Sequence, residues 1–107
     1  MTTFDDRERG FETKFAHDQE MMFRITARRN RLLGAWAAKL MGLTAEEADA
    51  YGKAVVQADF EEAGDEDVIR KLLGDLTGAG CSVDEAGVRA ALEEKSVEAK
   101  RQLMSES

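Results

Sequence analysis

The side chains that most often carry out catalysis are sparse in this sequence. Among 107 residues, His17 is the only histidine and Cys81 the only cysteine. No Ser or Cys is paired by motif with a nearby base, and Cys81 has no neighbouring Lys or Arg to activate its thiol. His17 could switch its charge near neutral pH, but a lone histidine among polar neighbours is more often simply exposed. We therefore expect a protein that is not an enzyme.

Two further segments resemble ligand-binding motifs only in part. The glycines from Gly74 to Gly80 lack the Lys and Ser/Thr that complete a phosphate-binding loop, so they indicate a helix terminus. An acidic run lacks the Gly and the distal Glu of a calcium loop and is interpreted as a solvated helix junction. The sequence therefore predicts no metal and no cofactor. The run comprises Asp59, Glu61, Glu62, Asp65, Glu66 and Asp67.

A basic cluster is the remaining candidate for binding chemistry. Arg24, Arg28 and Arg31 recur at i, i+4 and i+7 along one flank of a helix, and Glu20 stands where it can pair with Arg24. We expect these arginines to face the acidic helices. One alternative is an anchor for an acidic partner. Another is a crevice in which Trp36, with Arg28 or Arg31, binds a nucleotide or another anion.

The distribution of charge limits the class of partner. The net charge is −7, made up of −2 in residues 1–19, +4 in residues 20–44 and −9 in residues 45–107. A body this acidic repels phosphate backbones, so binding to nucleic acid would depend on four arginines alone. We expect no nucleic-acid binding. These arginines are Arg24, Arg28, Arg29 and Arg31.

Composition predicts an all-α fold in a single domain. The chain contains no proline and is rich in straight-chain residues and alanine, which lose little rotamer freedom in a helix. A chain of this length buries roughly 60 to 70% of its unfolded surface, enough for one core. No window of 18 apolar residues and no secretory signal is present, so we expect a cytosolic protein that does not insert into a membrane.

Helix-start and helix-stop signals divide residues 20–107 into four helices. The first begins near Glu20 and ends before Gly42, and Thr44 with Glu47 forms a capping box that begins the second, which Gly64 closes. Asp65 caps a short third helix. Ser82 with Glu85 repeats the capping box, placing the fourth helix from Val83 onward. Short connections favour antiparallel packing, hence a four-helix bundle. The predicted core contains Trp36, Leu40, Tyr51, Val55, Phe60, Leu72, Leu76 and Leu92.

Residues 1–19 form an arm that the core does not explain. Phe4, Phe11 and Phe15 recur on one helical face, and charged residues cover the others. A helix of about 15 residues is marginal in water, and Gly10 weakens it by about 1 kcal/mol relative to Ala. We expect a mobile arm that becomes helical when its aromatic stripe enters a groove on another protein. The alternative is a packed extension of the first helix.

Three segments also resemble a known family. The segments TTFDDRERGFETKFAHDQE, ARRNRLLGAWAAKLMG and VVQADFEEAGDEDVIRKL are similar to the alphaproteobacterial zeta subunit, an inhibitor of the F1 part of ATP synthase. The resemblance covers nearly the whole chain. It implies a four-helix bundle whose mobile N-terminal segment inserts at a catalytic α/β interface of F1 and blocks ATP hydrolysis.

The resemblance also implies the partners and the residues that meet them. The α and β subunits of F1 would be the partners, a contact with the central stalk stays open, and the protein would associate peripherally with membrane-bound ATP synthase on the cytoplasmic side. The matching family positions in the arm are Phe4, Asp5, Asp6, Arg7, Glu8, Arg9, Phe11, Glu12, Lys14 and Phe15.

Overall fold

Four α-helices and no strand make up the part of the chain that the structure describes. The computed structural model describes residues 3–60 and 64–106, and for residues 3–17 it describes the backbone alone. The predicted all-α class is therefore confirmed. The helices are α1 (Thr3–Met41), α2 (Ala45–Ala58), α3 (Glu66–Gly78) and α4 (Glu85–Glu106).

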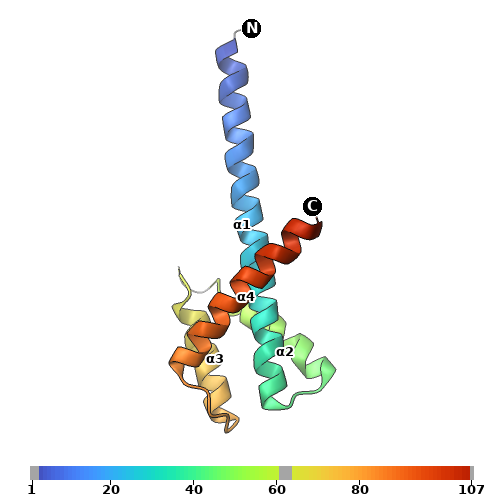
Figure 1. Ribbon diagram of the computed structural model, residues 1–107, viewed down its shortest axis with the longest axis vertical. Helices are drawn as coiled ribbons and strands as arrows, with labels where there is room; N and C mark the ends of the chain where they lie inside the picture. Colours follow the sequence, from blue (N-terminus) through green and yellow to red (C-terminus); the bar gives the residue numbers. More distant parts are fainter. Residues whose placement is uncertain (1–2, 61–63, 107) are drawn as a thin grey trace.

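Helix α1 is the axis of the molecule. Its 39 residues form one continuous helix that gives the molecule its long dimension in an envelope of 65 × 26 × 21 Å. The C-terminal half of α1 packs against the other three helices, whereas its N-terminal half projects beyond them (Figure 1). The sequence placed the start of the body's first helix near Glu20. The helix instead continues back to Thr3, so arm and body share one helical backbone.

Successive helices run in opposite senses along the long axis, as the short connections predicted (Figure 1). Helix α2 packs against α1 and α3, and α4 crosses α1 and also contacts α3. No pair of described residues joins α2 directly to α4. Helices α1 and α3 are therefore in contact across the centre of the bundle, whereas α2 and α4 are not.

Local signals explain most helix ends. The predicted capping box is present: Glu47 N–H donates to Thr44 Oγ1 over 3.2 Å, and Thr44 N–H donates to Glu47 Oε1 over 2.8 Å. The bond from the Thr44 backbone lowers the pKa of Glu47. Gly42 and Gly80 adopt φ angles of 72° and 81° just beyond α1 and α3, the left-handed conformation that glycine allows.

Besides the start of α1, two predicted boundaries were wrong. Helix α4 begins at Glu85 instead of Val83, because Asp84 Oδ1 accepts a hydrogen bond from Gly87 N–H over 2.9 Å and thereby serves as the cap in place of Ser82. Helix α2 ends at Ala58, earlier than the predicted closure at Gly64. At the end of α2, the Asp59 N–H donates to the carbonyls of Val55 and Gln57.

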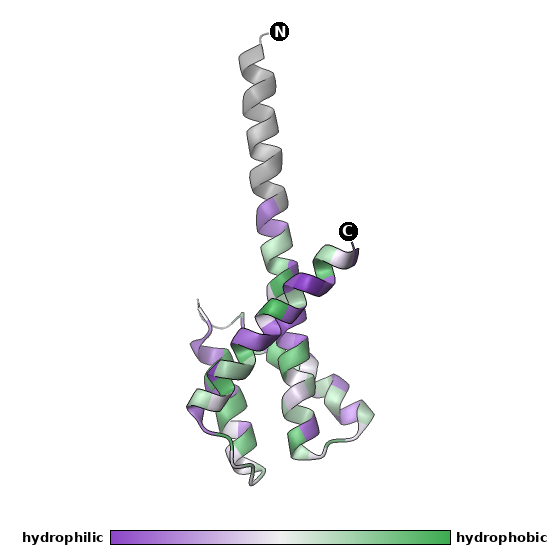
Figure 2. Ribbon diagram, in the orientation of Figure 1, coloured by the Kyte–Doolittle hydropathy of each residue, from purple (hydrophilic) through white to green (hydrophobic). Residues whose placement is uncertain are grey.

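The core lies between the helices and consists of aliphatic side chains. In the coloured parts of the helices, hydrophobic and hydrophilic residues are interspersed (Figure 2), as expected for helices that bury only part of their surface. Of the predicted core residues, Val55, Leu72 and Leu76 are fully buried, and Trp36, Tyr51 and Leu92 are partly buried against them. The other buried members of the cluster are Leu33, Ala37, Val68, Ile69, Val88 and Ala91.

Leu40 and Phe60 were wrongly predicted to be core residues. Leu40 is 45% exposed in the last turn of α1, and Phe60 is 61% exposed. Phe60 lies past the end of α2 at Ala58, so the register of that helix, on which its predicted burial depended, does not extend to it. Exposure of this aromatic ring becomes important for the binding surface.

Candidate partner-binding surface

The arm extends from the body as the first part of α1. The structure places the backbone of the arm residues from position 3 onward in α1, and their side chains lie outside the described residues. An α-helix rises about 1.5 Å per residue, so the segment from residue 3 to residue 19 is about 25 Å long. The backbone thus brings the predicted binding positions onto one rod. These are Phe4, Asp5, Asp6, Arg7, Glu8, Arg9, Phe11, Glu12, Lys14 and Phe15.

The prediction that the basic flank of α1 faces the acidic helices is confirmed for Arg28. Arg28 Nη1 donates to Glu106 Oε1 and to Gln102 Oε1, each over 3.0 Å, which fastens α4 across α1. The hydrogen bond from Arg28 lowers the pKa of Glu106. Arg24 pairs with Glu20 over 3.1 Å within α1, as the i, i+4 spacing predicted. Both members of that pair are exposed.

The alternative ligand site has its residues in different surroundings. Arg28 and Arg31 line a surface hollow beside Phe23, with Glu106 of α4 at its edge. Trp36 is not among the residues that line this hollow and packs partly buried against the core. Glu106 already neutralises Arg28 there, which lowers the attraction of the hollow for an anion.

The sequence prediction named Arg29 only as one of four arginines and missed its burial, the deepest among the described charged side chains of α1. Only 7% of Arg29 is exposed, and its Nη1 lies 3.0 Å from Asp65 Oδ1 and its Nη2 3.8 Å from Asp59 Oδ1. Its Nε and Nη2 also donate to Asn30 Oδ1 over 3.1 and 2.9 Å. Arg29 stands four residues before Leu33, on the face that enters the core. This four-residue spacing from Leu33 could have indicated from the sequence that Arg29 is buried.

The acidic run between α2 and α3 is consequently more than a solvated junction. Asp59 and Asp65 pair with Arg29, and Glu66 Oε2 lies 3.0 Å from Arg89 Nη2 on α4. Asp67 is 7% exposed, and its Oδ1 accepts from Arg70 Nη1 over 3.2 Å. The interpretation as a solvated segment was therefore wrong for Asp59 and Asp67, whereas the side chains of Asp65 and Glu66 are 45% and 61% exposed. Glu61 and Glu62 lie outside the described residues.

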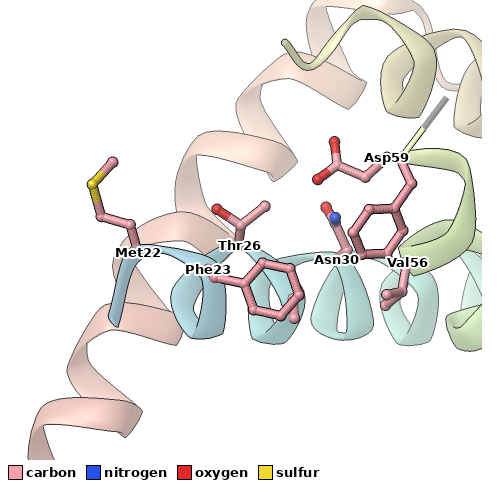
Figure 3. Close-up of a pocket in the computed structure, with 8 residues that line it drawn as sticks. Met22, Phe23, Thr26, Asn30, Val56 and Asp59 are labelled. Carbon is pink, nitrogen blue, oxygen red and sulfur yellow. The ribbon is translucent and has the colours of Figure 1, made fainter. Parts of the chain in front are cut away.

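A shallow apolar hollow opens beside this ion-pair network, where α1 leaves the body. It has a volume of about 180 Å³, and Phe23, Thr26 and Asn30 of α1 face Val56 and Asp59 across it (Figure 3). Met22 and Phe60 complete its rim with Phe23. The rings of Phe23 and Phe60 lie with their centroids 6.0 Å apart and tilted by 38°. This separation is typical of a favourable aromatic pair.

Within residues 18–60 and 64–106, the side chains suited to metal binding are not grouped. Cys81 is partly buried, and its thiol donates to the Leu40 carbonyl over 3.4 Å, which agrees with a passive role. His17 lies in the part of α1 whose side chains are not described. Among the described residues, no three His, Cys, Asp or Glu side chains gather as metal ligands. No described helix has the length and apolar character needed to cross a membrane.

Fold and surface together define a class: small all-α proteins in which one helix protrudes far beyond a compact helical body. The chain belongs to the ATPase inhibitor subunit zeta family, whose profile matches residues 1–102 and so includes both arm and body. A solution NMR structure of a protein 53% identical in sequence superposes with a TM-score of 0.73, covering 81% of this chain and 99% of the other. No protein of curated function matches the chain.

Proposed function

We infer that this chain inhibits ATP hydrolysis by the F1 part of ATP synthase, with the arm inserted at a catalytic α/β interface. The observation that carries this proposal is the protrusion of α1. A helix normally buries one face against its own domain, but the N-terminal half of α1 extends beyond the other helices (Figure 1). The family profile includes this same segment.

The arm has the residue pattern of a helix that binds in a groove. Phe4, Phe11 and Phe15 recur on one side of a helix, and a groove that accepts them would remove three phenyl rings from water. Each buried ring contributes roughly 1.5 to 3 kcal/mol. That gain is enough to offset an ordering cost of about 2 to 5 kcal/mol for an arm that is mobile when free.

Inhibition in this proposal is mechanical and needs no catalytic group. The inserted arm holds the α/β interface in one conformation while the body, too wide to follow, stays outside and obstructs rotation. The partners are the α and β subunits of F1. The protein is then a peripheral component of ATP synthase on the cytoplasmic side.

Substitution of the aromatic stripe tests this function. Phe4→Ala and Phe11→Ala each remove a ring from the interface, and truncation of a central aromatic contact weakens binding by about 2 kcal/mol, equivalent to roughly thirtyfold. We expect the concentration of each variant that halves ATP hydrolysis by the cognate F1 to rise by that factor. Val97→Ala, which trims a 68% exposed side chain on α4, is the matched control and leaves inhibition unchanged. Equal inhibition by all four chains would refute insertion of the stripe.

A further inference from the structure

Three large apolar side chains gather on the body at the base of the arm. Met22 is 67% exposed, Phe23 58% and Phe60 61%. Single exposed apolar residues are common on protein surfaces, whereas a cluster rimmed by polar groups marks a contact surface. We call Met22, Phe23 and Phe60 the basal patch.

The basal patch is held in place by the structure beneath it. Asn30, only 1% exposed, forms part of the floor of the hollow, and Arg29 donates two hydrogen bonds to it. The same arginine pairs with Asp59, the residue before Phe60. Phe60 is therefore anchored through its neighbour while its own ring stays exposed, so the hollow between α1 and the end of α2 exists before any partner arrives.

One member of the basal patch, Met22, also continues the aromatic stripe of the arm. Positions 4, 11, 15 and 22 are separated by 7, 4 and 7 residues, spacings that return to the same side of an α-helix. Helix α1 is continuous from Thr3 to Met41, so this side is shared by the arm and by Met22. A groove that receives the stripe therefore leads directly to the patch.

We propose that the basal patch is a second docking contact for the same F1 α/β interface, receiving an apolar side chain from the rim of the groove that holds the arm. This inference rests on the proposed function. Continuity along α1 identifies the partner, because a groove that holds the arm as a helix reaches the patch at the base of that helix. The patch then fixes how far the arm enters the groove.

Paired substitutions in the full-length chain test this contact. In Phe23→Ala with Phe60→Ala, both rings of the patch are lost, and we expect at least tenfold weaker inhibition of F1 hydrolysis, on the order seen for central interface aromatics. Val97→Ala serves as the control because it is equally exposed but lies outside the hollow. Thermal midpoints verify that each variant is folded. If the double variant is unfolded, Met22→Ala is tested in its place. We expect the concentration of Met22→Ala that halves F1 hydrolysis to rise severalfold.

The outcomes separate this inference from the proposed function. Weaker inhibition by Phe11→Ala together with unchanged inhibition by the patch variants overturns the second contact and leaves arm insertion standing. Unchanged inhibition by Phe11→Ala and by the patch variants overturns arm insertion as well as the second contact. Sedimentation of the free chain identifies the competing occupant: a dimer that the patch substitutions dissociate, with inhibition unaffected, would show that a second copy of the chain covers the patch.

Discussion

Arg29 and Arg24, five residues apart on α1, show how burial determines the contribution of a charged side chain to stability. Arg29 is buried among Asp59, Asp65 and Asn30, where removing one partner strands the others. Arg24 makes a solvent-exposed pair with Glu20, an arrangement that contributes about 0 to 1 kcal/mol. The junction between α2 and α3 therefore depends on Arg29 far more than the arm base depends on Arg24.

Tyr51 joins α2 to α3 through a polar contact at the edge of the core. Its hydroxyl donates to Asp75 Oδ2 over 2.7 Å, and Lys71 Nζ donates to the same oxygen over 3.0 Å. The Lys71 ammonium also lies 5.1 Å from the centre of the Tyr51 ring. Burial, together with the bond to Asp75, raises the pKa of Tyr51 above its ordinary value of 10.0.

This shift predicts an alkaline loss of stability. Because the folded-state pKa of Tyr51 is raised, its contribution is fully present below pH 10.0 and is lost as the pH rises toward the folded pKa. Tyr51→Phe should lower the free energy of unfolding by about 0.5 to 1.5 kcal/mol at neutral pH, the usual value of one hydrogen bond. Urea unfolding of both chains should show this difference shrinking above pH 10.0. A difference that stays constant to strongly alkaline pH would contradict the assignment.

At the scale of elements, the crossing of α1 and α2 is closer than ordinary side chains permit. A Cβ added at Gly34 would lie 2.6 Å from the Cα of Gly52, and both glycines are buried. The two backbones meet directly at this point. Gly52, which is unfavourable inside a helix by propensity, is explained by this contact.

Gly34→Ala should therefore destabilise the body. The new methyl group forces α1 and α2 apart, and overpacking of this kind lowers the free energy of unfolding by about 1 to 3 kcal/mol. Gly74→Ala in α3 is the matched control, since nothing lies within 4 Å of its added Cβ, and it should stabilise the chain by about 0.4 to 1 kcal/mol. Thermal or urea unfolding measures both. A Gly34→Ala chain that is as stable as the original or more stable would show that the close crossing is absent in solution.

Signals between residues close in sequence were sufficient to predict where most helices begin and end. Features that depend on residues distant in sequence could not be predicted in this way. The Thr44 and Glu47 capping box involves residues three positions apart, so the sequence contains all of it. Phe60 was assigned to the core because its helical register was extended beyond Ala58, and Arg29 was missed because its partners lie about 30 residues away. The arm was predicted from phenylalanines that the core of the body does not explain. The roles of its side chains stay predictions.

For the whole molecule, the division into an arm (1–19) and a body (20–107) is the proposal that links fold to function. The core of the body is built from residues that follow position 30, and the described contacts among α1, α2, α3 and α4 hold it together. No other helix runs beside the N-terminal half of α1 (Figure 1), and an isolated helix of about 15 residues is marginal in water. We therefore expect the arm to be mobile in the free chain and dispensable for folding.

Inhibition of F1 by a chain that lacks residues 1–19 tests the account most directly. ATP hydrolysis by the cognate F1 is titrated with the full chain and with residues 20–107, after the thermal midpoints of the two chains have been compared. The account predicts nearly equal midpoints, because the core contacts remain, and complete loss of inhibition by the shortened chain, because the segment that enters the interface is gone. Full inhibition by residues 20–107 would contradict the central claim.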